Sequence, residues 1–144
     1  MMRNEALLKT LTQIQGIAGY EKKVREFIME EIRPYADEML VDPLGSLIAL
    51  KKGTGGPASK KIMFAAHMDE IGFMVKKIEE DGRLRVCNVG WNWTASAYNT
   101  RVVFRNGVYG VVSCTGNIEE AHNDPNCLFI DIGAKSKEDA MKYV

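Results

Sequence analysis

The feature that most constrains the fold is an unbroken apolar run, residues 62–66, that leads directly into polar residues. Consecutive apolar positions are typical of a strand covered on both faces, as in a mixed sheet flanked by helices. His67, Asp69 and Glu70 follow at once, before the chain becomes apolar again. The run therefore predicts a strand of an α/β sheet whose carboxyl end delivers a histidine and two acids to the crevice where such sheets bind ligands.

Two amphipathic helices are predicted before this run. Their apolar residues recur at helical spacing on either side of a break at residues 16–19: Leu7, Leu8, Leu11 and Ile14 in the first helix, and Val24, Phe27, Ile28 and Ile32 in the second. Pro34 ends the second helix. Residues 37–53 then read as strand, turn, strand, because Pro43 and Gly45 occupy favoured turn positions.

From Ile71 onward the sequence changes to short strands and tight turns. The pairs Asp81-Gly82 and Asn106-Gly107 each stand between two strand-like runs and predict hairpins with two-residue turns. A last strand follows, and a serine at 136 with an acid at 139 predicts a capped helix. We therefore expect two domains, residues 1–70 and residues 71–144, of which the second is a small β domain.

Composition excludes several classes of partner. The 144 residues include 19 basic and 19 acidic side chains, so the formal net charge is zero and no global field favours nucleic acid or an anionic membrane. The longest apolar stretches are far shorter than the ~20 residues of a membrane span. The amphipathic N-terminus lacks the apolar region of a signal peptide, which predicts a cytoplasmic protein.

The histidine and the first acid of the opening stretch form a candidate metal site. In an extended chain His67 and Asp69 point to the same face, whereas Glu70 points to the other. An imidazole is a good ligand of zinc or cobalt, and an acid two residues away can orient the ring. The alternative from the pattern alone is a histidine that is simply satisfied by a neighbouring acid.

Other residue groups give weaker signals. Cys87, Cys114, His122 and Cys127 have the atom types of a structural zinc site, but their gaps fit no compact pattern, which favours reduced thiols. The aromatic residues near position 95 form either a binding loop or, the interpretation we favour, part of a core or a subunit contact: Trp91, Trp93 and Tyr98.

Paired acids raise glycoside hydrolysis as a rival chemistry. The pairs are Asp69-Glu70, Glu79-Glu80 and Glu119-Glu120. Glycosidases need two carboxyl groups that face each other across a sugar, whereas neighbours in an extended chain point to opposite faces. Salt-bridging or solvated acids are therefore the better interpretation. Residues 51–61 also lack the order of a phosphate-binding loop.

Four segments together resemble the N-terminal part of the M42 family of metallo-aminopeptidases. In order they are LLKTLTQIQGIAGYEKKVREFI, VDPLGSLIALKKG, KKIMFAAHMDEIGFMVKKIEEDGRLRV and LFIDIGAKSKEDA. That family includes the glutamyl and the tetrahedral aminopeptidases. The resemblance implies an α/β catalytic domain, with a mixed sheet flanked by helices, into which a small β-barrel-like dimerisation domain is inserted.

The resemblance also implies a function and a site. Family members remove N-terminal residues from peptides with two divalent metal ions, zinc or cobalt, bridged by a carboxylate and a water. By similarity His67 binds one ion, Asp69 is the acid that supports this ligand and the active centre, and Glu70 makes a structural bond or salt bridge. The implied partners are peptide substrates and further copies of the chain, in a dimer or a larger assembly such as a dodecamer.

The implied mechanism is metal-assisted hydrolysis, in which a glutamate takes a proton from the bridging water and the hydroxide attacks the scissile carbonyl. The family's other ligands and its catalytic glutamate follow the DIGA segment, and this sequence ends at Val144. We expect that these residues alone do not form a working two-metal site. The alternative is a truncated, non-catalytic relative that serves as an assembly or interaction module.

Overall fold

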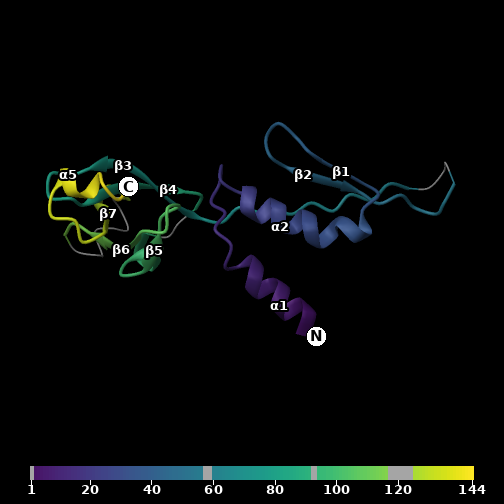
Figure 1. Ribbon diagram of the computed structural model, residues 1–144, viewed down its shortest axis with the longest axis horizontal. Helices are drawn as coiled ribbons and strands as arrows, with labels where there is room; N and C mark the ends of the chain where they lie inside the picture. The colour runs from purple at the N-terminus through teal and green to yellow at the C-terminus, as the bar shows by residue number, and fades with distance from the viewer. Residues whose placement is uncertain (1, 57–59, 92–93, 117–124) are drawn as a thin grey trace. The chain divides into compact units, whose positions relative to one another are not determined.

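The chain divides into two compact units, Met1–Glu70 and Ile71–Val144. The computed structural model describes residues 2–56, 60–91, 94–116 and 125–144. Figure 1 follows the chain from helix α1 near the N-terminus to helix α5 near the C-terminus. Both helices and strands occur, so the protein is of the α/β class.

The described residues of the first unit form two α-helices, one 3₁₀ helix and one β-hairpin. Its elements are α1 (Met2–Leu11), α2 (Lys22–Ile32), the 3₁₀ helix η1 (Arg33–Tyr35), β1 (Glu38–Val41) and β2 (Leu47–Leu50). Both helices and the hairpin predicted from the sequence are confirmed. Pro34 lies in η1, which begins directly after the last residue of α2. No helix in the described ranges is both long and apolar enough to cross a bilayer.

The second unit is built on a five-stranded antiparallel sheet in the order β3-β4-β7-β6-β5. Its strands are β3 (Gly72–Ile78), β4 (Leu84–Val89), β5 (Arg101–Val103), β6 (Tyr109–Cys114) and β7 (Leu128–Asp131). The short helices among its described residues are α3 (Thr94–Ala97), η2 (Pro125–Cys127) and α5 (Lys137–Ala140). The last strand β7 joins the middle of the sheet, between β4 and β6, and so ties the two predicted hairpins together.

The hairpin loops have a different geometry from the one predicted. In both β hairpins of the second unit, three residues connect the paired ends: Glu79 donates to the carbonyl of Arg83, and Phe104 donates to the carbonyl of Val108. Only the glycines of these loops have positive φ, 87° at Gly82 and 89° at Gly107. A two-residue type I′ turn would need positive φ at the preceding residue as well. The loops are therefore type I turns followed by a left-handed glycine.

The core of the second unit lies between the sheet and the C-terminal helix. The residues that are almost completely buried come from the three middle strands and α5: Leu84, Val86, Val112, Leu128, Ile130 and Ala140. Half-buried side chains such as Phe73 and Val75 of β3 and Val102 of β5 pack against them. Alternation of buried and exposed positions along β4 and β6 matches a sheet with one covered face.

The structure differs from the prediction at residues 62–66. This stretch forms no strand, and Ile62, Met63 and Phe64 have 79%, 88% and 94% of their surface exposed. Both sheets in the described parts of the chain are antiparallel, so the predicted mixed sheet flanked by helices is not formed here. The physical reason is that the described part of the chain offers these residues no neighbouring strand with which to share backbone hydrogen bonds.

Candidate metal centre

The predicted site residues His67 and Asp69 contact each other in the structure. Nδ1 of His67 lies 3.0 Å from the backbone oxygen of Asp69 and 3.1 Å from its Oδ1. A backbone carbonyl and an ionised carboxylate can only accept hydrogen bonds, so this arrangement favours the tautomer with the proton on Nδ1. The other ring nitrogen, Nε2, then has its lone pair available for a metal ion.

The His67–Asp69 pair is accessible. The His67 side chain is 83% exposed and the Asp69 side chain is 40% exposed. A histidine sealed in an apolar interior would be an ordinary core residue, and this one is not. The ring is therefore open to ligands supplied from elsewhere.

The donor set is too small for a complete centre. A catalytic zinc ion takes about three protein ligands, and a two-metal site takes more. Within the ranges that the structure describes, no group of three or more histidine, cysteine, aspartate or glutamate side chains is placed to hold a metal ion. The pair by itself has the donors for one ligand position and its supporting acid, and no more.

Glu70 holds the segment next to the pair in place. Its backbone N–H donates to the carbonyl of Gly16 at 2.8 Å, and its Oε1 accepts from the Gly16 N–H at 2.9 Å. A parallel β-bridge joins Ile17 to Glu70 at the same point. The expected structural bond of Glu70 is thus confirmed. Gly16 was visible in the sequence only as the break between two helices, and nothing there indicated its partner.

Asp69 also lines a hollow of about 260 Å³. Met68, Asp69 and Glu70 line it together with residues of the N-terminal segment from Leu11 to Val24. Gly16 cannot be replaced freely beside it, because a Cβ at this position would lie 2.4 Å from Cγ2 of Val24. His67 is not among the residues that line the hollow. Asp69 is the residue that both lines the hollow and contacts the imidazole.

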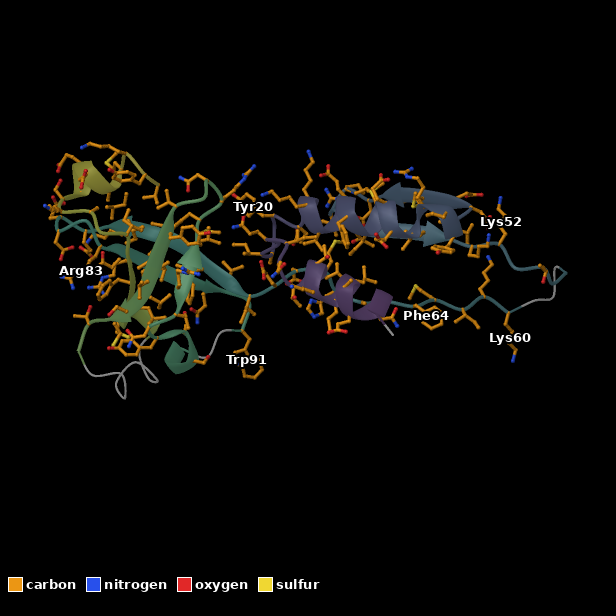
Figure 2. The ribbon with its side chains drawn as sticks, turned by 60° about the horizontal axis from the view of Figure 1, so that its bottom comes forward. Tyr20, Lys52, Lys60, Phe64, Arg83 and Trp91 are labelled. Atoms are coloured by element: carbon orange, nitrogen blue, oxygen red, sulfur yellow. The ribbon has the colours of Figure 1, made fainter. Side chains whose placement is uncertain are left out.

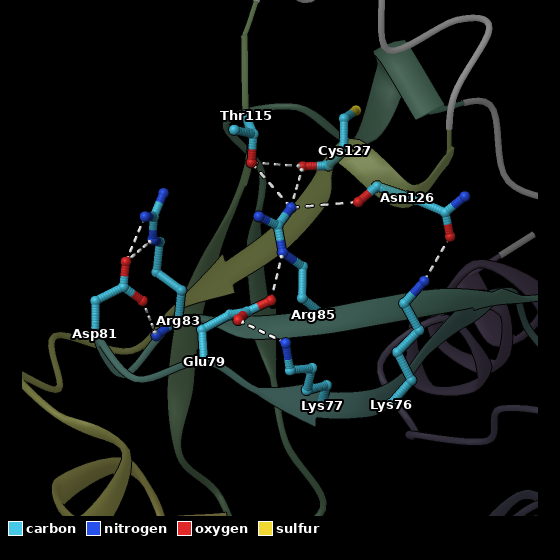
Figure 3. Close-up of polar contacts among 9 residues, drawn as sticks. All are labelled: Lys76, Lys77, Glu79, Asp81, Arg83, Arg85, Thr115, Asn126 and Cys127. Atoms are coloured by element: carbon cyan, nitrogen blue, oxygen red, sulfur yellow. Dashed lines mark hydrogen bonds and ion pairs between the residues drawn. The ribbon is translucent and has the colours of Figure 1, made fainter.

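The acid pair Glu79-Glu80 of the second unit forms salt bridges, as expected. Glu79 contacts Lys77 at 3.0 Å and Arg85 at 3.2 Å, and Glu80 contacts Lys137 at 3.3 Å. The hydrogen bond from Lys77, followed by that from Arg85, lowers the pKa of the Glu79 carboxyl group. Figure 3 shows how Arg85 lies between Glu79 and the chain near Cys127. Glu119 and Glu120 lie outside the described residues.

The cysteines do not form a metal site with one another. Cys87 is exposed, Cys114 is half-buried and Cys127 is buried, and no disulfide joins them. His122, the fourth residue of that candidate site, lies outside the described residues, as does Trp93 of the aromatic loop. Trp91 is exposed rather than part of a core (Figure 2), and Tyr98 has 36% of its surface exposed. A subunit contact at these aromatics stays a prediction.

Known proteins match the chain along almost all of its length. The family model for the M42 glutamyl aminopeptidases matches residues 45–144. The chain is 48% identical over 139 residues to a protein of Acetivibrio thermocellus that bears the provisional name aminopeptidase. That match covers 96% of this chain and 41% of the relative.

Solved structures of peptidases are also similar to this chain. The aminopeptidase APDkam598 from the archaeon Desulfurococcus kamchatkensis has a TM-score of 0.85 at 34% identity, covering 99% of this chain and 41% of that one. The TET1 peptidase of Pyrococcus horikoshii has a TM-score of 0.73 at 39% identity, covering 95% of this chain and 42% of that one, and it can assemble into a tetrahedron or a large octahedral shell.

These matches define the class as peptidases with an α/β fold. The chain belongs to the M42 peptidase family. It spans 41% of the A. thermocellus relative and corresponds to an N-terminal portion of the family.

Proposed function

We propose that this chain is the N-terminal part of an M42 metallo-aminopeptidase, in which His67 binds one of two divalent ions and Asp69 supports it. The observation that supports the proposal is the contact between Nδ1 of His67 and the two oxygens of Asp69. An oxygen partner on one ring nitrogen is the usual arrangement for a histidine whose other nitrogen binds a metal ion.

The proposed role of each residue follows from the chemistry of its side chain. Zinc or cobalt, when bound, would acidify a water and polarise the carbonyl of a peptide substrate. Asp69 would hold the proton at Nδ1 and fix the plane of the ring, so that Nε2 faces the ion. His67 would supply one ligand, and the other ligands and the proton-accepting glutamate would come from the part of the family that this chain does not span.

The two units would have different roles in this proposal. Residues 1–70 would belong to the α/β catalytic domain with its mixed sheet, and residues 71–144 would be the inserted, barrel-like dimerisation domain. The five-stranded antiparallel sheet of the second unit supports this assignment. Assembly into a homo-oligomer is supported by the large shells of the P. horikoshii relative. Cytoplasmic location stays a prediction.

A second candidate function follows from the incomplete donor set. With too few metal-binding side chains in the described ranges, the 144 residues would serve as an assembly or interaction module without turnover. In both cases we expect no steady aminopeptidase activity from a preparation whose mass is verified as that of this chain, with zinc or cobalt added. Sustained release of N-terminal residues would contradict both.

A covalent fusion separates the two functions. The part of the A. thermocellus relative that lies beyond the match would be joined to Val144, and metal content and hydrolysis of amino-acid p-nitroanilides would be measured. We expect bound metal and turnover. His67→Ala should lose metal, and Asp69→Asn should lower metal affinity by about 10–100-fold, because a ring without its carboxylate partner is a poorer ligand.

The other histidine of the chain provides the matched control. His122→Ala should keep full metal content and activity, since the proposal gives that residue no role. A fusion that folds cooperatively by circular dichroism but whose metal content is the same with and without His67 would contradict the proposed centre. It would leave the module as the better function.

A further inference from the structure

A hollow of about 350 Å³ lies on the sheet of the second unit, at strands β5, β6 and β7. Two residues of opposite charge line it, Arg101 and Asp131, and the apolar part of the lining includes Tyr109 and Val111. Small-molecule pockets have volumes of about 300–1,000 Å³, so this hollow has room for a small ligand. It is made entirely of residues of the second unit.

The strand register places the two charges on either side of Val111. Arg101 is the Cα partner of Val111 in the β5–β6 pair, and Val111 is the partner of Asp131 in the β6–β7 pair. Paired residues point to the same face of a sheet, so the three form one row. Neighbouring strands lie about 4.8 Å apart, which separates the backbones of Arg101 and Asp131 by about 10 Å. The apolar residue Val111 therefore lies between two opposite charges.

Arg101 presents free hydrogen-bond donors to the hollow. Its guanidinium lies over the ring of Tyr109, 5.3 Å from the centroid, and within the described part of the chain this is the one interaction of its side chain. Contact with the ring leaves the N–H groups at the edge of the guanidinium plane available to a carboxylate. Arg83 is the contrast, because it also lies over a ring but donates to Asp81 (Figure 3).

Asp131 keeps its negative charge available to a cation. Its Oδ1 accepts from the N–H of Gly133 at 2.7 Å, which orients the carboxylate. No cation in the described ranges forms an ion pair with it. Arg83 interacts with it only at longer range: the hydrogen bond to Asp81 is the main cause of the raised pKa of Arg83, and the charge of Asp131 is a lesser one. Oδ2 of Asp131 is left to accept from a ligand.

The two charges decide which class of ligand fits. A simple anion would be attracted by Arg101 and repelled by Asp131, and a metal ion would meet the reverse. Either end of a peptide carries only one of the two charges that the hollow can match. A free amino acid carries a carboxylate and an ammonium group on one carbon, and an apolar side chain on that carbon would lie over Val111 and beside Tyr109.

We infer that this hollow binds a free α-amino acid with an apolar side chain, with the carboxylate on Arg101 and the ammonium group on Asp131. The inference goes beyond the proposed function, since binding needs neither a metal ion nor turnover. It assigns a small-molecule site to the second unit, apart from the residues that the metal centre would use.

Titration of the 144-residue chain with L-leucine, followed by amide chemical shifts, tests this inference. We expect saturable shifts confined to β5, β6, β7 and the residues next to them, with a Kd of about 1 mM, as is reasonable for so small a ligand. Two analogues each lack one charge: leucinamide has no carboxylate and 4-methylpentanoate has no ammonium group. Each should bind at least about tenfold more weakly, because it loses a charge-assisted hydrogen bond.

Two variants and a control locate the ligand. Arg101→Gln and Asp131→Asn should each weaken L-leucine binding at least about tenfold. Both positions are exposed, and asparagine keeps an oxygen for the Gly133 N–H, so both variants should keep the chemical shifts of the core residues. Arg33→Gln removes one arginine charge from the first unit, where Arg33 pairs with Glu30, and should leave binding unchanged.

Three outcomes would overturn the inference: no saturable shift up to about fifty times the expected Kd, unchanged binding with Arg101→Gln, or equal binding of L-leucine and 4-methylpentanoate. The last result would mean a site for any carboxylate. Failure here is separable from failure of the proposed function. Loss of leucine binding leaves the metal centre untouched, whereas a fusion that binds L-leucine but holds no His67-dependent metal removes only the metal centre.

Discussion

The two units of this chain differ in how far they complete their own cores. Nearly all of the buried apolar residues in the described ranges belong to the second unit, whereas the first buries only Val24 to that degree. The second unit has every partner that its central strands need within 74 consecutive residues. The first unit has helices and a hairpin, but its most apolar segment, residues 62–66, is exposed to solvent.

This difference shows that an apolar pattern predicts that a segment is suited to burial, but does not identify the residues that would bury it. Strands β4, β6 and β7 meet that need locally, through two hairpins and one returning strand. Residues 62–66 have an equally strong pattern and no partner in the described ranges.

The largest effect should come from breaking the core of the second unit. Leu128→Ala removes a side chain with no exposed surface from the first position of β7 and should lower the free energy of unfolding by about 2–5 kcal/mol. Urea titration followed by tryptophan fluorescence measures it, since both tryptophans follow Ile71. Leu44→Ala, at an exposed turn, should change stability by less than about 0.5 kcal/mol. Equal effects would contradict the comparison.

A polar network should account for a smaller share of the second unit's stability. Arg85 donates from Nη1 to Thr115 Oγ1 at 2.9 Å and to the carbonyl of Cys127 at 3.1 Å, and its side chain is only 20% exposed (Figure 3). Arg85→Met should cost about 1–3 kcal/mol, because it leaves these acceptors with fewer partners.

Arg83 is the matched control for that network. Its guanidinium also lies over the ring of Phe129, 4.9 Å from the centroid against 5.8 Å for Arg85, but its ion pair is local, with Asp81. Arg83→Met should therefore cost about 0–1 kcal/mol, as surface ion pairs do. If urea titration gives both variants the same loss, the network through Arg85 has no special role.

In the first unit, the bond between Glu70 and Gly16 should have a local effect. Glu70→Ala removes the acceptor of the Gly16 N–H and should cost about 0.5–1.5 kcal/mol. Hydrogen exchange at residues 16–20 should become faster. Glu70→Gln keeps an oxygen in the same place and should restore slow exchange, a rescue that would be absent if only the charge mattered.

Acid should destabilise the second unit slightly. The pKa of Glu79 is lowered by Lys77 and then Arg85, and the pKa of Asp81 is lowered by Arg83. A carboxyl group with a lowered folded-state pKa stabilises the fold above its unfolded-state pKa, and this contribution is lost as pH falls through the folded-state value. The melting temperature should therefore hold above the ordinary glutamate value of 4.5 and fall below it.

Glu79→Gln should flatten that acid dependence. Glu80→Gln is the neighbouring control, since the Glu80 side chain is mostly exposed in its contact with Lys137. Melting curves between pH 3 and pH 6 compare the two variants, in the range where carboxyl groups ordinarily titrate. The same dependence in both variants would mean that the ion pairs of Glu79 contribute nothing to it.

Much of the fold could be predicted because its signals are local. Helical spacing placed α1 and α2, and the capping serine at 136 does accept a hydrogen bond from the N–H of Asp139. The hairpins were also found, but not their loop type, because Asp-Gly and Asn-Gly suit both a type I′ turn and a type I turn with a following glycine. The assignment of the units to a catalytic and a dimerisation domain stays a prediction.

The candidate site was predictable only in part. Two-residue spacing placed His67 beside Asp69, and the structure brings their side chains into contact. That spacing could not reveal the bond from Glu70 to Gly16, which joins residues 54 positions apart. The strand predicted at residues 62–66 is not formed, because a local apolar pattern does not supply the neighbouring strand that pairing needs. The metal role of His67 stays a prediction.

Hydrogen exchange of the 144-residue chain by itself tests the central comparison most directly. The amides of β4, β6 and β7 should be the slowest to exchange, with protection close to the global free energy of unfolding, whereas those of residues 62–66 should exchange almost as fast as an unstructured peptide. Protection of residues 62–66 equal to that of β4 in a monodisperse, monomeric sample would contradict the account.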